Sequence, residues 1–485
     1  MTPLQKKNSG SYYTPSDVAH ALVRWVVRRP SDRLLDPSCG DGQFLQHHKK
    51  SVGVEQSEGA ALAAHERAPW ALIHEGDFFS WAANTKERFE CLAGNPPFIR
   101  YQRFSGDMRA GALDYCAKLG ANFSGLTSSW APFLVAAASL LKPGGRMAFV
   151  VPAEVGHAPY ARPLLEYLAA HFGVVSFLAV RRKIFADLSE DVWLLYASGF
   201  GSSVNEIRLS QTEAFDIEQA APVDGLAISI SELAQANWRL RPFLLSCEQL
   251  AEYRAAALST KTRRLGDFAR VSIGYVSGAN DFFHLRPSQA DDLGIAKKWL
   301  VPSVRNGRVL RASQIEIGDV AEWIEQDEPC LLLKIPSSTE IDRSLRKYLE
   351  TDAARTASQA FKCRVRSPWY AVPDVRVPSA FLSYMSGDRP SLVQNGARCT
   401  GTNSVHLVDL HDAADMPTLR AAWDDPLTQL SWELEGHPLG GGMLKLEPRE
   451  AQRIVIAPEP TRSKRRTQLL QDAHATMQAW RHCGG

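Results

Sequence analysis

Residues 30–200 alternate short apolar stretches with helical segments, and this alternation restricts the possible folds more than any other feature of the chain. The stretches predicted as strands lie at 33–35, 51–54, 71–73, 89–93, 146–151, 173–180 and 191–198. Strands that alternate with helices form an open, largely parallel sheet with helices on both faces. We therefore predict an α/β fold for a first domain at residues 1–230.

After about residue 205 the alternation gives way to short apolar runs, turns and scattered prolines. A chain of 485 residues is also too long for one ordinary compact domain. We predict a second, mixed α+β domain at residues 231–485, ending in a helix that follows a basic segment at 462–466.

The composition is that of an ordinary globular protein, with 45% apolar residues, 22% charged residues and a formal net charge of +2. Any surface for a polyanion must therefore come from local clusters of basic residues. The eight cysteines are scattered without a CxxC pair, which predicts neither a metal site nor a disulfide framework. No stretch approaches the roughly 20 apolar residues of a membrane helix, so we expect a soluble, cytoplasmic protein without a membrane partner.

Acidic residues follow the first three predicted strands. Asp36 opens the turn Asp36-Pro37-Ser38-Cys39-Gly40-Asp41-Gly42, Glu55 ends the second strand, and Asp77-Phe78 follows the third. Small residues in a turn allow a ligand to approach the backbone, but the opening acid argues against pyrophosphate. Asp36 suits an ammonium group, Glu55 suits ribose hydroxyls, and Asp77 with Phe78 suits an adenine ring. S-adenosylmethionine combines these three groups, whereas each acid alone is more simply a solvated strand end.

The fourth strand leads into Gly94-Asn95-Pro96-Pro97-Phe98. The Asn95 side-chain oxygen and the Pro96 carbonyl can accept both hydrogens of a planar amine, and Phe98 can stack on the ring that carries it. The two prolines fix φ, so the acceptors are held before substrate arrives. Taken alone, Asn-Pro is equally a tight turn after a strand.

A helix is predicted to begin near Thr14, which can serve as its N-cap. Pro15 suits the first helical position, and Asp17 completes a Thr-x-x-Asp capping box. Another short helix is predicted directly after the glycine turn, at 43–45.

Together these motifs, with Tyr13-Thr14-Pro15 before them, resemble the gamma class of DNA adenine-N6 methyltransferases, the Taq-type enzymes of restriction–modification systems. The resemblance implies a Rossmann-like class I S-adenosylmethionine-dependent methyltransferase domain followed by a target-recognition domain that binds double-stranded DNA. It implies a catalytic loop of Asn95, Pro96 and Phe98, and it places Phe185 against the far face of a flipped base. The cofactor contacts that follow from the resemblance and the glycine turn are Thr14, Asp36, Ser38, Cys39, Gly40, Glu55, Asp77, Phe78 and Pro97.

The segment at 361–370 interleaves basic and aromatic residues, which suits phosphate contact and stacking. We predict that Lys362, Arg364 and Arg366 contact DNA; an amphipathic strand with a solvated basic face is the alternative. Segments 273–283, 402–406 and 440–442 are similar to recognition regions of the same class, with less specific motifs.

Asn-Pro-Pro-aromatic loops also occur in enzymes that methylate guanine N2 in RNA or a protein glutamine, and a non-catalytic DNA-binding subunit is a further alternative. The Pro-Cys pair of a cytosine-C5 enzyme is found only at Pro329-Cys330, outside the catalytic half. Without a nuclease constellation, we expect a monomeric, nucleoid-associated modification enzyme that works beside a separate restriction or defence enzyme.

Overall fold

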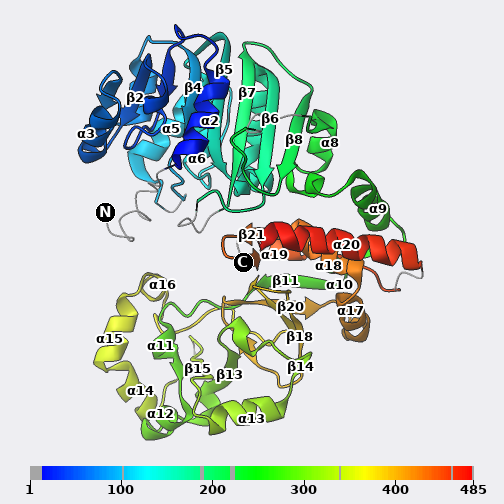
Figure 1. Cartoon of the computed structure of the whole chain (residues 1–485). Helices are drawn as coiled ribbons and strands as arrows, with labels where there is room; N and C mark the ends of the chain where they lie inside the picture. Colours follow the sequence, from blue (N-terminus) through cyan, green and yellow to red (C-terminus); the bar gives the residue numbers. More distant parts are fainter. Residues whose placement is uncertain are drawn as a thin grey trace. The chain divides into compact units, whose positions relative to one another are not determined.

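The computed structural model describes residues 14–100, 103–185, 191–218, 224–337, 340–459 and 463–482. The chain divides into two compact units (Figure 1). The first comprises Met1–Leu245 with His482–Gly485, and the second comprises Ser246–Arg481. The division thus falls after Leu245, whereas the sequence-based boundary was placed after residue 230. Within the described ranges, no helix is long and apolar enough to cross a membrane.

The first unit contains a nine-stranded sheet in the order β3-β2-β1-β4-β5-β7-β6-β8-β9. The pairs that join β3, β2, β1, β4 and β5 are all parallel, and β7 lies antiparallel between β5 and β6. The predicted open, largely parallel sheet is therefore confirmed. The strands are β1 (Leu34–Asp36), β2 (Ser51–Glu55), β3 (Leu72–Glu75), β4 (Phe89–Gly94), β5 (Leu141–Pro152), β6 (Phe172–Val180), β7 (Val192–Phe200), β8 (Glu206–Thr212) and β9 (Leu226–Ser229).

Helices cover both faces of this sheet, because alternate residues of each strand point to opposite sides. Helix α2 (Ser16–Val26) packs on one face, where most of its buried residues belong to a hydrophobic cluster. All nine residues of α6 (Trp130–Ala138) are also buried, but none of them belongs to that cluster. The cluster against α2 takes every second residue of four strands, namely Cys91 and Ala93, Ala148 and Val150, Leu178 and Val180, and Leu194 and Tyr196. The other helices of this unit are α3 (Glu58–Arg67), α4 (Phe78–Asn84), α5 (Gly106–Lys118), α7 (Arg162–His171) and α8 (Ile230–Gln235).

Two local predictions in this unit are wrong. Helix α2 has Pro15 as its N-cap and no side-chain capping bond, so the expected capping box of Thr14 and Asp17 does not form. The Thr14 hydroxyl instead accepts a hydrogen bond from the Asn95 amide nitrogen. The helix expected at 43–45 is only a 3-10 turn at Leu45–His47, because the glycine turn itself continues through left-handed residues Gly40 and Gly42.

The second unit is a mixed α+β assembly of four small sheets. Their strand orders are β11-β20-β16-β18-β14, β12-β15-β13-β19, β17-β22-β21 and β10-β23. The strands are β10 (Arg263–Arg264), β11 (Ala269–Ile273), β12 (His284–Leu285), β13 (Leu300–Val304), β14 (Gln314–Ile315), β15 (Leu331–Leu333), β16 (Ala380–Ser383), β17 (Met385–Ser386), β18 (Leu392–Asn395), β19 (Thr400–Gly401), β20 (Val405–Leu410), β21 (His437–Leu439), β22 (Met443–Lys445) and β23 (Val455–Ile456). The helices are α9 (Cys247–Ala257), α10 (Leu265–Phe268), α11 (Asn280–Phe283), α12 (Pro287–Asp292), α13 (Ile317–Glu325), α14 (Arg343–Leu349), α15 (Asp352–Gln359), α16 (Phe361–Arg364), α17 (Met416–Trp423), α18 (Pro426–Glu435), α19 (Pro448–Ala451) and α20 (Lys464–Arg481).

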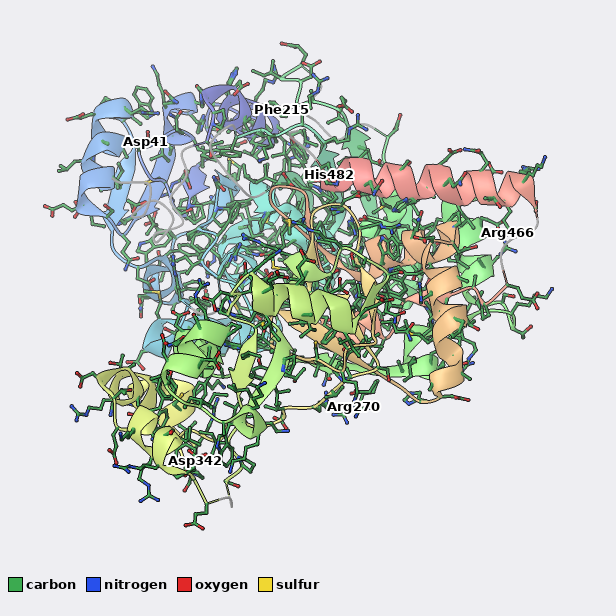
Figure 2. The ribbon with its side chains drawn as sticks, turned by 90° about the horizontal axis from the view of Figure 1, so that it is seen from below. Asp41, Phe215, Arg270, Asp342, Arg466 and His482 are labelled. Atoms are coloured by element: carbon green, nitrogen blue, oxygen red, sulfur yellow. The ribbon has the colours of Figure 1, made fainter. Side chains whose placement is uncertain are left out.

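The last helix, α20, is held to its own unit at both ends. Figure 2 shows Arg466 near its N-terminal end, where the guanidinium pairs with Glu252 of α9. At the other end, Arg481 is fully buried and donates to both carboxylate oxygens of Glu433 in α18. The same guanidinium also donates to the carbonyls of Gly387, Asp388 and Gly442. This single side chain therefore joins α18 to two separate loops.

Candidate active site

Four of the predicted site residues lie at one edge of the nine-stranded sheet. Asp36 ends β1, Glu55 ends β2, Asp77 follows β3, and Asn95 follows β4. Because these four strands are parallel neighbours, their carboxyl ends lie side by side. In open α/β sheets this edge is where ligands bind.

Asp36 has a buried carboxyl group, and only one of its two oxygens accepts a hydrogen bond from the described residues. Its side chain is 1% exposed, and Oδ1 accepts from the Ser38 backbone N–H at 3.1 Å. Among the described residues, Oδ2 has no hydrogen-bond partner. Burial, with repulsion from Glu55 and Asp41, raises the pKa of Asp36 to about 8. An unpaired buried carboxylate oxygen of this kind is suited to a cationic group.

Gly94 is required for Asp36 to occupy this position. A Cβ added at Gly94 would lie 2.7 Å from Asp36 Oδ1 and 3.1 Å from a ring carbon of Phe149. Any larger residue at the end of β4 would therefore displace the carboxylate or the ring beneath it.

Glu55 and Asp77 organise the backbone around them. The two oxygens of Glu55 accept from the N–H groups of Gly40, at 3.0 Å, and Ser57, at 2.8 Å. Asp77 caps α4 by accepting from the N–H of Ser80 at 2.8 Å. A carboxylate has about four acceptor positions, so both acids retain capacity for ligand hydroxyl or amino groups.

Two predicted cofactor contacts have buried side chains. Cys39 is 4% exposed and packs below the turn, where a Cβ at Gly53 would lie 2.6 Å from its sulfur. Burial raises the pKa of this thiol. Phe78 is 5% exposed and its ring centroid lies 4.5 Å from that of Phe133 in α6. Both side chains are thus buried at this edge of the sheet.

The loop after β4 is clamped at the carbonyls of Asn95 and Pro97. The Ser38 hydroxyl donates to the Asn95 carbonyl at 3.1 Å. The Pro97 carbonyl accepts from the Ser129 hydroxyl at 2.5 Å and from the Ile99 N–H at 3.0 Å. Among the described residues, no donor reaches the carbonyl of Pro96 between them. Hydrogen bonds therefore hold the loop at two of its carbonyls, on either side of Pro96.

Sequence reasoning missed Ser129 altogether. It precedes α6 and also accepts from the Ile99 N–H at 3.0 Å, while its own N–H donates to the Ile99 carbonyl at 2.9 Å. A serine before an apolar helix indicates an N-cap, but this hydroxyl makes no helix-capping bond. The position of Ser129 in the sequence therefore predicts a helix cap, and it does not predict a contact with the loop after β4.

Phe98 and Phe185 contact the same hydrophobic cluster. Phe185 follows β6, is 7% exposed and belongs to the cluster beneath α2. Phe98 is half-buried and packs against that cluster, as does Ile184. The structure thus brings the two predicted base-stacking residues to one apolar region, although 87 residues separate them in the sequence.

The three basic residues predicted to contact DNA differ in their surroundings. Lys362 and Arg364 lie in the short helix α16, Arg366 lies just after it, and the segment contains no strand, so the alternative of an amphipathic strand is wrong. Lys362 and Arg364 are exposed on this helix. Arg366 is partly buried and donates to the carbonyls of Ser277, at 2.8 Å, and Val276, at 2.5 Å. Arg366 therefore joins this segment to the 273–283 segment.

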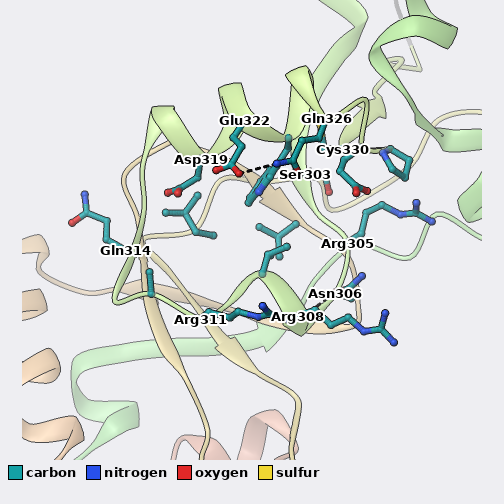
Figure 3. Close-up of a pocket in the computed structure, with 17 residues that line it drawn as sticks. Ser303, Arg305, Asn306, Arg308, Arg311, Gln314, Asp319, Glu322, Gln326 and Cys330 are labelled. Atoms are coloured by element: carbon teal, nitrogen blue, oxygen red, sulfur yellow. Dashed lines mark hydrogen bonds between the residues drawn. The ribbon is translucent and has the colours of Figure 1, made fainter.

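A separate cavity of about 570 Å³ lies in the second unit and contains none of the predicted site residues. Arg305, Arg308 and Arg311 line one side, and Asp319 and Glu322 of α13 line the other (Figure 3). We assign it no part in the predicted chemistry. Within the described ranges, no group of three or more metal-ligating side chains occurs.

Family models match both units. Residues 237–482 match "Type II methyltransferase M.Eco57I, C-terminal domain", which covers about half of the chain. Residues 45–185 match "Eco57I restriction-modification methylase", and residues 1–68 match "N-6 DNA Methylase".

Similar proteins include two that extend over nearly the whole chain. Type II methyltransferase M.AccI of Acinetobacter calcoaceticus is 18% identical over 93% of this chain and 86% of its own length. Type II methyltransferase M.XamI of Xanthomonas campestris pv. amaranthicola is 21% identical over 92% and 85%. A tRNA1(Val) (adenine(37)-N6)-methyltransferase of Actinobacillus succinogenes is 30% identical over 28% of this chain and 59% of its own length.

Among solved structures, the Type IIL restriction-modification enzyme MmeI is similar in fold, with 12% identity and a TM-score of 0.52. The match covers 94% of this chain and 69% of that chain. The strand order and this likeness confirm the predicted Rossmann-like class I domain followed by a mixed α+β domain. The chain belongs to the family of Eco57I-type restriction–modification methyltransferases.

Proposed function

We propose that this protein transfers a methyl group from S-adenosylmethionine to N6 of a flipped adenine in double-stranded DNA. It would act as the cytoplasmic modification component of a restriction–modification or related defence system, beside a separate restriction or defence enzyme. The observation that carries the proposal is the Asn95–Phe98 loop, which hydrogen bonds to the carbonyls of Asn95 and Pro97 hold at the ligand edge of the sheet.

The residues of this edge fit the cofactor. The open Oδ2 of Asp36 suits its ammonium group, and Glu55 and Asp77 retain acceptor capacity for the ribose hydroxyls and the adenine amino group. Thr14, Ser38 and Gly40, and the backbone of Cys39 and Pro97, complete the proposed pocket, with Phe78 packed below it. When bound, S-adenosylmethionine supplies a methyl group on a cationic sulfur.

The catalytic loop would prepare the acceptor nitrogen. The amino group of adenine is a poor nucleophile because its lone pair is delocalised into the ring. The Asn95 amide nitrogen donates to the Thr14 hydroxyl at 3.2 Å, so Oδ1 is the Asn95 atom that would accept one substrate N–H. The Pro96 carbonyl would accept the other. These contacts raise electron density on nitrogen, and fixed acceptors need no rearrangement during the reaction.

Adenine N6 can be reached only outside the base stack, so the proposal includes base flipping. Unstacking costs on the order of a few kcal/mol, which contacts to the extruded base must offset. Phe98 would stack on one face of the base, and Phe185 would cover the other from the same apolar region.

The alternative functions differ in the group that would accept the methyl group, while the Asn95–Phe98 loop would be the same in each. Guanine N2 in RNA and a glutamine side chain are also planar amines, and the similar tRNA enzyme matches only 28% of this chain. The type II methyltransferases match both units, and this extent favours DNA. A non-catalytic DNA-binding subunit would not require the clamped loop and the open Asp36 oxygen.

Cofactor affinity is expected to depend on pH because an ionised Asp36 must meet an ammonium group. Since burial holds the pKa of Asp36 at about 8, binding below pH 8 must release a proton. Affinity should therefore rise by about tenfold per pH unit between pH 6 and the pKa. Calorimetry in buffers of different ionisation enthalpy measures both the affinity for the cofactor and the number of protons released on binding. In Asp36→Asn the released proton should disappear; a wild-type affinity that is constant from pH 6 to 8 would contradict the assignment.

The function is tested by offering labelled S-adenosylmethionine and three acceptors to the purified protein: duplex DNA, transfer RNA and a glutamine-containing protein extract. Mass spectrometry of the digested products identifies the methylated group. We expect N6-methyladenine in DNA. Methyl transfer to RNA guanine or to glutamine would overturn the proposal, and the absence of transfer to all three would favour the non-catalytic alternative.

A further inference from the structure

Helix α16 presents an exposed aromatic ring between basic side chains. Phe361 and Val365 are each 65% exposed, and Lys362 and Arg364 are exposed beside them. We refer to these four residues as the α16 patch. An aromatic ring beside basic side chains is a combination suited to nucleic acid, because the ring can stack and the cations can contact phosphates.

The patch has a rigid support. Cys363, in the middle of α16, is fully buried, and its sulfur contacts the Ser277 carbonyl at 3.5 Å. A Cβ added at Gly278 would lie 2.9 Å from Cβ of Lys362, so the 273–283 segment approaches α16 as closely as a glycine allows. Together with the two hydrogen bonds of Arg366, these contacts hold the patch in one orientation.

The charge of the patch is uncompensated. Neither Lys362 nor Arg364 forms an ion pair with any residue in the described part of the chain. Figure 1 shows α14, α15 and α16 in succession within this unit, with α16 at the end of the series.

We propose that the α16 patch is seated on duplex DNA, with Lys362 and Arg364 on backbone phosphates and Phe361 against the sugar–base surface. Two unpaired cations beside an aromatic ring match a polyanion that carries stacked rings. An apolar area of only two side chains is small for a stable protein interface. Arg366 does not contact a phosphate in this proposal. It holds the α16 patch in place through its hydrogen bonds to the carbonyls of Ser277 and Val276. The inference rests on the proposed function of the chain.

Salt dependence of duplex binding tests the phosphate contacts. Each phosphate neutralised contributes about 0.9 to the slope of log K against log salt. The double variant Lys362→Gln/Arg364→Gln should therefore lower that slope by nearly two for a 30-base-pair duplex. The matched control is Arg343→Gln/Lys347→Gln, which removes two exposed charges from α14, and its slope should stay at the wild-type value.

The aromatic contact is tested separately. Phe361→Ala should weaken duplex binding about tenfold or more without altering the slope, because stacking does not release counterions. Leu258→Ala, which shortens an apolar side chain that is 82% exposed in the same unit, should leave affinity unchanged.

Methylation by the wild-type protein separates the two hypotheses. If the wild type methylates DNA while the patch variants keep its slope and affinity, the α16 inference fails alone. If the wild type neither binds nor methylates any duplex, both the proposed function and this inference fail.

Discussion

Asn95→Ala is expected to lower the single-turnover rate of methyl transfer by about 100-fold or more while the affinity for S-adenosylmethionine stays near that of the wild type. Loss of one fixed hydrogen-bonding group at a reacting centre typically has an effect of this size. Cofactor affinity should persist because the proposed contacts come mainly from Asp36, Glu55 and Asp77, on other strands. Rapid-quench measurement with saturating cofactor isolates the chemical step from product release.

The control for this variant is Asn84→Ala, which removes an amide at the end of α4 that donates to the Ser80 carbonyl. Its rate should match the wild type. If Asn95→Ala retained a rate within threefold of the wild type, the Asn95 amide would have no part in preparing the acceptor. A parallel loss of cofactor affinity would show instead that Asn95 holds the ligand edge together.

Arg481→Ala is expected to destabilise the second unit by about 3–5 kcal/mol, because it removes the buried guanidinium that pairs with the buried carboxylate of Glu433. It also removes the donors that satisfy the carbonyls of Gly387, Asp388 and Gly442. Urea denaturation followed by tryptophan fluorescence measures the change. The double variant Arg481→Ala/Glu433→Gln should be more stable than Arg481→Ala alone, since it also removes the buried negative charge that paired with Arg481.

Arg465→Ala is the matched control on the same helix. Arg465 pairs with Glu248, but both side chains are largely exposed, so the pair should contribute little to stability. A midpoint for Arg481→Ala that equals that of Arg465→Ala would contradict the structural importance of the buried guanidinium.

The ligand edge could be predicted from the sequence because its determinants are local. Asp36, Glu55 and Asp77 each follow an apolar run within a βα alternation, and parallel strands bring such positions to one edge whatever the details of packing. The Asn-Pro-Pro-Phe loop was predictable for the same reason, since it follows the strand next to that of Asp36.

The remaining parts depend on contacts between distant segments. Ser129 lies 32 residues from Pro97 and Thr14 lies 81 from Asn95, so no local pattern predicts either hydrogen bond. Arg366 contacts Ser277 across 89 residues, and its guanidinium could not be distinguished in sequence from the exposed side chains of Lys362 and Arg364. Local spacing also favoured a capping role for Thr14, whereas its hydroxyl accepts a hydrogen bond from the Asn95 amide.

Our main proposal is that the clamped loop holds adenine N6 of DNA while this nitrogen accepts a methyl group. It is tested most directly by expressing the protein in a host free of DNA methylation and sequencing the genome with base-modification detection. The account predicts N6-methyladenine at one recurring sequence motif, and none in a strain that carries Asn95→Ala. Methylated cytosine, or a genome that stays unmodified while the wild-type protein is folded and binds its cofactor, would contradict it.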